Sequence, residues 1–220
     1  MKIFVCADIH GNKAIIKKLK RIDKRVDAIF ICGDLGGKEI HGKTFKEFSS
    51  YQKTFVKNSE ERFKTLNTKL KYILGNDDWF ESDGEFYLSQ PELIGEYVFY
   101  PFEYTPTTPF NTNREVNENK MAYELGKLEC DANSILIAHA PPYEAGDKLY
   151  SGKHCGSKAI RNWIENVQPR VWINGHIHED SGYTYIGKTL VINCACDYRT
   201  DELSGFVIDL ENLEVEEVHY

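Results

Sequence analysis

The chain has 220 residues, of which 41% are hydrophobic and 13% aromatic, and its formal net charge is −7. This composition excludes a disordered or collagen-like chain, because enough apolar surface is present to offset the entropy lost on folding. The length predicts a single domain over residues 1–220. The acidic balance argues against a broad nucleic-acid surface, which needs clustered Lys and Arg, but it is compatible with a small phosphate-bearing ligand.

The N-terminal apolar run covers only residues 3–7, which is too short for a signal-peptide core or a membrane span. No other stretch approaches 18 uncharged apolar residues, so we expect a cytoplasmic protein without a membrane partner. The six cysteines are scattered, and Cys6 and Cys32 lie inside strand-like runs. Reduced, buried thiols are therefore expected.

Strand and helix patterns alternate in the first third of the chain. Apolar runs predict strands at Lys2–Ala7, Asp27–Cys32 and Leu70–Leu74. Helical periodicity predicts a helix at Gly11–Lys24 and one long or two broken helices within Lys43–Lys69. The β-α-β-α-β order with short links predicts a parallel sheet that is buried on both faces.

The signal weakens between Ser82 and Cys130. Residues Tyr97–Tyr100 suit a strand, but three prolines within Pro101–Asn119 predict an irregular excursion, for which a flap is one interpretation. Beyond it we expect strands at Ser134–Ala138 and Val171–Ile173, a helix at Gly156–Gln168, and short antiparallel strands at Tyr183–Ile186, Thr189–Asn193, Phe206–Leu210 and Leu213–Val218. The pattern predicts an α/β fold with two mixed sheets.

Polar residues of one kind follow five predicted strands. They are Asp8 and His10 after the first strand, Asp34 after the second, Asn76, Asp77 and Asp78 after the third, His139 after the strand ending at Ala138, and His176 and His178 after the strand ending at Asn174. Ligands of open α/β sheets collect outside the carboxyl ends of strands. We therefore expect these side chains to converge on one crevice.

The chemistry of this set points to metal ions. Oxygen ligands mixed with imidazole suit Mn²⁺, Fe, Zn²⁺ or similar ions, whereas an all-oxygen set would suggest Mg²⁺ or Ca²⁺. Seven candidate ligands are too many for one ion and suit two ions that share a carboxylate: Asp8, His10, Asp34, Asn76, His139, His176 and His178. Two ions about 3.5–4 Å apart clamp the oxygens of a phosphoryl group and lower the pKa of a bound water. Manganese is expected first, with iron, zinc, nickel or magnesium as alternatives.

The sequence resembles the calcineurin-like metallophosphoesterase superfamily, whose pattern is D-x-H, G-D, G-N-H-[D/E], H and G-H-x-H. The matching segments are DIH at 8–10, GDLGG at 33–37, GNDD at 75–78, HAPP at 139–142 and GHIHE at 175–179. Residues 152–180 look closest to the small archaeal and bacterial phosphoesterases of the superfamily. The resemblance implies a four-layer αββα sandwich with two mixed β-sheets, and metal-dependent hydrolysis of phosphate esters by in-line attack of a metal-activated water.

The resemblance also implies roles for individual residues. Asp8, His10, Asp34 and His178 would surround the first metal, and Asp34 would bridge to a second metal held by Asn76, His139 and His176. Asn76 is also expected to contact the substrate. Asn12 would either contact a substrate oxygen or cap the following helix.

Asp77 departs from the family pattern, because the family usually has a histidine there that protonates the leaving oxygen or stabilises the transition state. Two nearby dications should lower the pKa of Asp77, so its carboxylate could not donate a proton and would repel a phosphate. A leaving group of low pKa, as in activated diesters, needs no acid. Alternatively, His154 reaches the site as the acid from a loop before a helix, or it only orders that loop.

We therefore expect a hydrolase of small phosphate esters, with diesters favoured over monoesters and a nucleotide among the candidate substrates. A non-catalytic protein-binding scaffold, like the retromer subunit of the superfamily, is the main alternative. The intact ligand set opposes the scaffold, and Asp77 favours it. A nuclease is also open, although DNA-repair members typically carry an added DNA-binding region and the family histidine. The sequence leaves open whether the chain forms a homo-oligomer.

Overall fold

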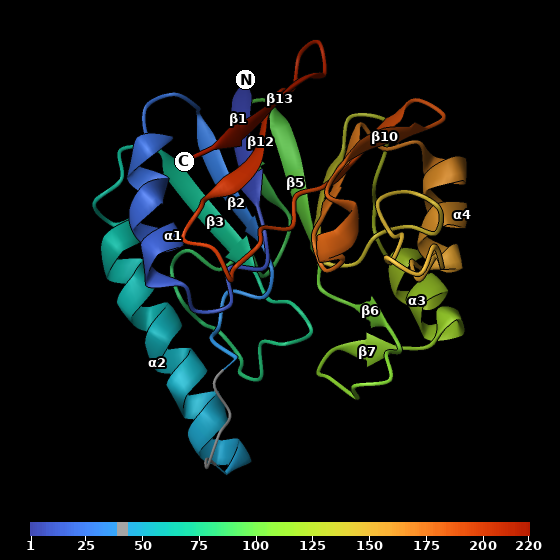
Figure 1. Cartoon of the computed structure of the whole chain (residues 1–220). Coiled ribbons are helices and arrows are strands. Elements are labelled where there is room, and N and C mark those ends of the chain that lie inside the picture. Colours follow the sequence, from blue (N-terminus) through green and yellow to red (C-terminus); the bar gives the residue numbers. More distant parts are fainter. Residues whose placement is uncertain (39–43) are drawn as a thin grey trace.

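Two β-sheets lie face to face at the centre of the protein, and helices cover the outer face of each sheet (Figure 1). The computed structural model describes residues 1–38 and 44–220. Across these residues the layers follow the order helices, sheet, sheet, helices. The predicted four-layer αββα sandwich with two mixed sheets is confirmed.

The first sheet has five strands, three of them parallel. It contains β1 (Lys2–Cys6), β2 (Ala28–Cys32), β3 (Lys69–Ile73), β12 (Ser204–Asp209) and β13 (Glu214–His219). The order is β13-β12-β1-β2-β3, in which β1, β2 and β3 are parallel and β12 is antiparallel to both of its neighbours. Apolar residues fill β1 and β2 because both faces of these central strands are buried.

The second sheet has six strands and a parallel centre. It contains β4 (Glu92–Ile94), β5 (Tyr97–Phe102), β8 (Ile135–Ala138), β9 (Val171–Asn174), β10 (Gly182–Ile186) and β11 (Thr189–Asn193), in the order β10-β11-β9-β8-β5-β4. Only the edge strands β4 and β10 are antiparallel to their neighbours. Two short strands, β6 (Thr105–Pro106) and β7 (Glu115–Val116), form a separate parallel pair.

The helices begin at polar residues that cap them. They are α1 (Lys13–Lys18), α2 (Phe45–Phe63), α3 (Glu118–Leu125) and α4 (Lys158–Val167), with 3-10 turns η1 (Leu19–Arg21) and η2 (His178–Asp180). The side chains of Asn12, Thr44, Asn117 and Ser157 accept hydrogen bonds from the first-turn N–H groups. Within the described ranges, no helix combines the length and apolarity needed to cross a bilayer.

Three hydrophobic clusters fill the three interfaces between layers. The first joins α1 and α2 to the five-stranded sheet through residues such as Ile15, Phe55 and Ile29. The second lies between the sheets, where the Phe30 ring of β2 stacks on the Phe99 ring of β5 with their centroids 4.5 Å apart. The third joins the six-stranded sheet to α3 and α4.

Every strand predicted from the sequence is present, with ends that differ by at most two residues. The helix predictions are confirmed with shorter bounds. Residues 45–63 form one long helix, while residue 43, the first of the predicted range, lies outside the described residues. The predicted range also ran too far, because the Asp23 carboxylate accepts the N–H groups of Asn67 and Thr68 and fixes a turn before β3.

The prediction of an irregular segment from Ser82 to Cys130 was wrong in part. Besides the predicted strand at β5, that segment contains β4 and α3, which were not predicted. Helix α3 escaped notice because it has only eight residues and buries only Met121 and Leu125. Two apolar positions one turn apart are too few to establish a helical period.

The contact between the two sheets generates a prediction about stability. Replacing the buried ring in Phe30→Ala should lower the free energy of unfolding by about 3–5 kcal/mol, because a cavity opens between two layers. Urea denaturation measures this loss. The matched control is Phe110→Ala, whose ring is 79% exposed, and it should change the free energy of unfolding by less than about 0.5 kcal/mol. Equal losses in the two variants would contradict the packing described.

Candidate metal centre

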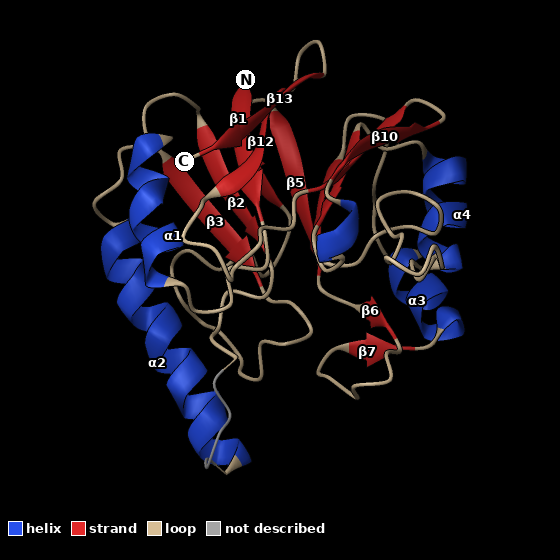
Figure 2. Ribbon diagram, viewed as in Figure 1, coloured by secondary structure: helices blue, strands red, loops and turns tan. Residues whose placement is uncertain are grey.

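The carboxyl ends of the parallel strands of both sheets meet at one edge of the protein, where loops gather below the sheets (Figure 2). The loops after β1 and β2 run side by side there. Three backbone hydrogen bonds join them: Asp8 N to the Gly33 carbonyl at 3.0 Å, His10 N to the Asp34 carbonyl at 2.8 Å, and Gly11 N to the Leu35 carbonyl at 3.1 Å. The two loops are thus held in register with each other.

Asp78 ties the loop after β2 to the loop after β3. Its buried carboxylate accepts hydrogen bonds from the backbone N–H groups of Leu35, Gly36 and Gly75 at 2.7–3.2 Å. Burial and the negative charge of Asp34 raise the pKa of Asp78 to about 7. Asp78 therefore holds the loops in place rather than facing a ligand.

Four of the predicted ligands have left-handed backbone conformations. The φ angles are 60° for Asp8, 44° for His10, 52° for Asp34 and 74° for His176. Such residues outside glycine are uncommon and cost about 1 kcal/mol or more each. Strain of this kind concentrates at functional sites, where the surrounding structure enforces it.

Two glycines allow the loops to approach one another. A Cβ at Gly75 would lie 2.2 Å from Asp34 Oδ1, and a Cβ at Gly33, where φ is +93°, would lie 2.4 Å from His139 Nδ1. A side chain at either position would displace a predicted ligand.

The first group of predicted ligands contains Asp8, His10 and His178, whose ligating atoms lie within 4.8 Å of one another. His10 Nε2 is 3.8 Å from Asp8 Oδ1 and 3.6 Å from Asp34 Oδ2. His178 Nδ1 faces the Cys196 carbonyl at 2.9 Å, which turns Nε2 toward Asp8 Oδ1 at 3.7 Å. A carbonyl that orients the second ring nitrogen is the usual support for a metal-binding histidine.

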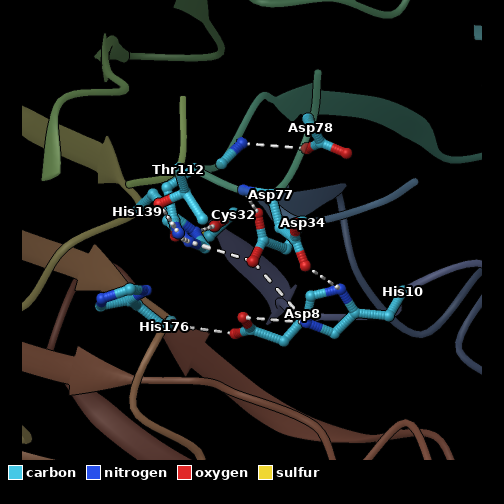
Figure 3. Close-up of polar contacts among 12 residues, drawn as sticks. Asp8, His10, Cys32, Asp34, Asp77, Asp78, Thr112, His139 and His176 are labelled. Atoms are coloured by element: carbon cyan, nitrogen blue, oxygen red, sulfur yellow. Dashed lines mark hydrogen bonds and ion pairs between the residues drawn. The ribbon is translucent and has the colours of Figure 1, made fainter. Parts of the chain in front are cut away.

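A second group contains Asp8, Asp34 and His139. His139 Nδ1 faces the Cys32 carbonyl at 2.8 Å, and Nε2 lies 2.9 Å from Asn76 Oδ1 and 3.5 Å from Asp34 Oδ2 (Figure 3). Asn76 is oriented by its amide nitrogen, which donates to Thr112 Oγ1 at 2.7 Å.

His176 joins the two sheets at the site. Its backbone N–H donates to Asp8 Oδ2 at 2.9 Å, and its ring packs edge-on against the His139 ring with centroids 5.2 Å apart. Burial, and then the positive charge of His139, lower the pKa of His176 to about 3. The structure thus brings all seven predicted ligands together.

The unsatisfied polar atoms of the site test whether a metal fits. Asp8 Oδ1 and both ring nitrogens of His10 are buried and have no hydrogen-bond partner among residues 1–38 and 44–220. Unpaired buried polar atoms are costly, and a carboxylate oxygen beside imidazole nitrogens is a donor set that divalent metals bind. The residues present therefore fit a divalent metal ion.

Asp77 lies at the outer side of this group, where its Oδ2 atom is 3.9 Å from His10 Nδ1 and its Oδ1 atom accepts from Trp79 Nε1 at 3.3 Å. Burial and the negative charge of Asp34 raise the pKa of the Asp77 carboxyl, and the charge of Lys38 opposes this shift. Bound dications would act in the opposite direction, so the lowered pKa expected from the sequence stays a prediction.

Asn12 caps α1, as one of its two predicted roles requires. Its amide oxygen accepts from Ala14 N at 2.8 Å and Ile15 N at 3.2 Å, and its amide nitrogen donates to the carbonyls of Tyr198 and Thr200. Both ends of the amide are engaged within the protein. These contacts favour the cap over the substrate contact.

His154 contacts residues of its own region. Its Nδ1 atom lies 2.6 Å from a carboxylate oxygen of the fully buried Asp147, and its ring packs edge-on to Tyr143. None of the contacts described for His154 involves a predicted metal ligand. These contacts favour the alternative in which His154 orders its loop, and they give no support to its role as the acid.

Two residues at the edge of the site, Lys38 and Tyr198, were not expected there from the sequence. The Tyr198 ring lies edge-on to the His10 ring, with centroids 4.6 Å apart, and the Lys38 ammonium lies over the Tyr198 ring. Tyr198 follows β11, whose carboxyl end reaches the same edge because β11 is parallel to β9. The sequence predicted antiparallel strands in this region, so the residues after β11 were not expected at this edge.

Arg114 contacts the loop after β3. Its guanidinium is nearly buried, pairs with Glu103 at 3.2 Å and donates to the carbonyls of Asp78 and Phe80. The Glu103 carboxylate also accepts from Leu74 N at 2.7 Å. Arg114 and Glu103 therefore hold the loop after β3 from behind.

A sequence model of the calcineurin-like phosphoesterase family matches residues 1–180. An uncharacterized protein from Methanocaldococcus jannaschii is 29% identical over 202 residues, which cover 88% of this chain and 87% of that protein. Among solved structures, one crystal structure matches with a TM-score of 0.78 at 17% identity, covering 100% of this chain and 98% of the other. A protein from Thermus thermophilus matches with a TM-score of 0.59 at 14% identity, covering 99% of this chain and 97% of the other. These structural likenesses show the fold.

The surroundings of His139 predict that metal binding releases a proton. Burial disfavours the charged ring, but the adjacent Asp34 carboxylate outweighs it and raises the pKa of His139 to about 10. The metal-free ring is therefore protonated at pH 7, and Nε2 must lose its proton to bind a metal. Calorimetric titration with Mn²⁺ in two buffers of different ionisation enthalpy should report the release of about one proton per protein. His154→Asn should leave that number unchanged, whereas a binding heat independent of the buffer would contradict the assignment.

Proposed function

Because the chain belongs to the calcineurin-like phosphoesterase family, we propose that it is a metal-dependent hydrolase of phosphate esters that uses two divalent ions. One observation supports the dinuclear centre best. The Asp34 carboxylate oxygen Oδ2 lies 3.6 Å from His10 Nε2 on one side and 3.5 Å from His139 Nε2 on the other. A single carboxylate between two sets of ligands is the arrangement that a bridged pair of ions requires.

Each ion has a set of ligands from different strand ends. Asp8, His10 and His178 would hold the first ion, Asn76, His139 and His176 the second, and Asp34 both. When bound, the ions supply Lewis-acid activation of water and of the phosphoryl oxygens. Mixed carboxylate, amide and imidazole ligands suit manganese first, with iron, zinc, nickel or magnesium as alternatives.

The protein keeps several of these ligands ready to bind. Burial lowers the pKa of His10 well below its usual value and that of His176 to about 3, so both rings are neutral at pH 7. A neutral imidazole offers a free lone pair without first losing a proton. The carbonyls that orient His139 and His178 fix which nitrogen faces the ions.

Asp77 supports a preference for phosphodiesters. Its carboxylate lies where the family usually has a histidine, and its Oδ2 atom is 3.9 Å from His10 Nδ1. A monoester near neutral pH approaches with almost two negative charges and a diester with one, so the carboxylate repels the monoester more strongly. We infer that the substrate is a small diester, with nucleotide diesters among the candidates. A protein-binding scaffold would have no use for buried ligand atoms left without partners.

Metal dependence is the first test of this function. We expect Mn²⁺ to stimulate hydrolysis of bis(p-nitrophenyl) phosphate and chelation to abolish it. Asp34→Asn should reduce the activity at least about 100-fold, because removal of the shared carboxylate weakens both metal sites. The control is Asp83→Asn, whose carboxylate is almost fully exposed. Metal-loaded protein that hydrolyses neither diesters nor monoesters would favour the scaffold.

Replacing Asp77, the residue that differs from the family pattern, tests the diester preference. Asp77→His restores the family residue and removes a negative charge from the site. The ratio of kcat/KM for p-nitrophenyl phosphate to that for bis(p-nitrophenyl) phosphate should rise about 10-fold or more, because the charge repulsion falls more for the dianion. An unchanged ratio would show that Asp77 does not set the preference. Metal content, measured on the same samples, checks that the centre is intact.

A further inference from the structure

The Asp77 carboxylate has a positively charged neighbour that the family pattern does not assign. The Lys38 ammonium lies 3.7 Å from Asp77 Oδ2, and Trp79 holds the other carboxylate oxygen. Lys38 follows Asp34 by four residues, in the same loop after β2. The ion pair therefore joins the loop after β2 to the loop after β3 at the outer side of the site.

A second contact places the same ammonium over the first group of ligands. Lys38 Nζ lies 4.8 Å from the centroid of the Tyr198 ring, which in turn packs edge-on against His10 and His178. The face of a tyrosine ring attracts a cation. Tyr198 and Asp77 therefore hold the ammonium beside the candidate metal ligands from two directions.

The Lys38 and Asp77 side chains both reach solvent at the edge of the candidate metal centre. The side chain of Lys38 is 39% exposed and that of Asp77 is 24% exposed, so the ammonium lies at the open side of the group. An incoming anion would meet it there.

We propose that Lys38 binds the phosphate group of the substrate, donating a hydrogen bond to a phosphoryl oxygen beside the position where the family usually has a histidine. This inference rests on the proposed function and deepens it, because it assigns a protein cation to the substrate. The residue at the family histidine position, Asp77, then acts through Lys38 as a positioning residue. No proton is transferred in this role, since the ammonium acts by its charge and its N–H groups.

In this role the Lys38 ammonium leaves the Asp77 carboxylate and binds a phosphoryl oxygen, and the chemistry of the pair allows that exchange. A partly exposed ion pair contributes little to stability, so its separation costs little. Lysine carries three N–H donors on a flexible four-carbon chain and can turn from Asp77 to a phosphoryl oxygen. A hydrogen bond from a charged donor to a phosphate is stronger than the bond between neutral groups.

The test combines phosphate binding with activity. Lys38→Met keeps most of the length of the side chain and removes the charge, and Lys38→Arg keeps the charge. Lys53→Met is the control, since Lys53 is exposed on α2. Isothermal titration of the metal-loaded proteins with inorganic phosphate should show affinity about 10-fold to 100-fold weaker in Lys38→Met and largely restored in Lys38→Arg. Lys53→Met should bind as the wild type does, and all variants should hold the same amount of metal.

Kinetics separates substrate binding from a structural effect. The value of kcat/KM for bis(p-nitrophenyl) phosphate should fall by a similar factor in Lys38→Met and recover in Lys38→Arg. Wild-type affinity for phosphate together with wild-type kcat/KM in Lys38→Met would overturn the role of Lys38 while leaving the hydrolase intact. A wild-type protein that binds metal but hydrolyses no phosphate ester would instead overturn the proposed function.

Discussion

The structure depends on a concentration of buried charged and polar groups that lack protein partners. Asp8 and Asp34 place two carboxylates at an edge where the buried atoms Asp8 Oδ1, His10 Nδ1 and His10 Nε2 have no hydrogen bond within the described part of the chain. Such groups are expensive to bury, and the described residues give these three atoms no hydrogen bond that would offset the cost. A divalent cation offsets the carboxylates and uses the imidazole lone pairs at the same time. The need to hold a cation thus explains the polar cluster that the apolar layers surround.

Holding that cluster in place requires a backbone that local preferences disfavour. Asp8, His10, Asp34 and His176 adopt left-handed conformations, and a glycine at position 75 is needed for the closest approach of two loops. Those conformations persist because rigid elements fix both ends of each loop. The strands are anchored by three apolar clusters. Asp78 and Arg114 close the loops from behind through hydrogen bonds to their backbone. Packing energy in the layers therefore maintains strain at the site.

Apolar runs and the polar residues that follow them predict the strands of this protein and the candidate ligands at the strand ends. The strands and the ligands after them follow from local patterns, because a buried parallel strand must be apolar and its carboxyl end must reach the common edge. Contacts between distant segments escape such patterns. Tyr198 reaches His10 only because β11 is parallel to β9 in the second sheet. His154 contacts Asp147, seven residues away in the sequence. The residues around His154 do not show whether its ring contacts Asp147 or the candidate metal centre.

The charges at the open side of the site follow a different logic from those at its centre. Inside, fixed carbonyls and neighbouring rings hold His139 and His178 in one orientation, as ligands require. At the outer side, Asp77 and Lys38 form a looser, partly exposed pair on two loops. A histidine there would combine positive charge and donor in one side chain. In the proposed function Lys38 supplies both the charge and the donor, and the Asp77 carboxylate beside it opposes a second negative charge on the phosphate. In the proposed function, the anion attraction therefore rests on Lys38 and the preference for the singly charged diester rests on Asp77.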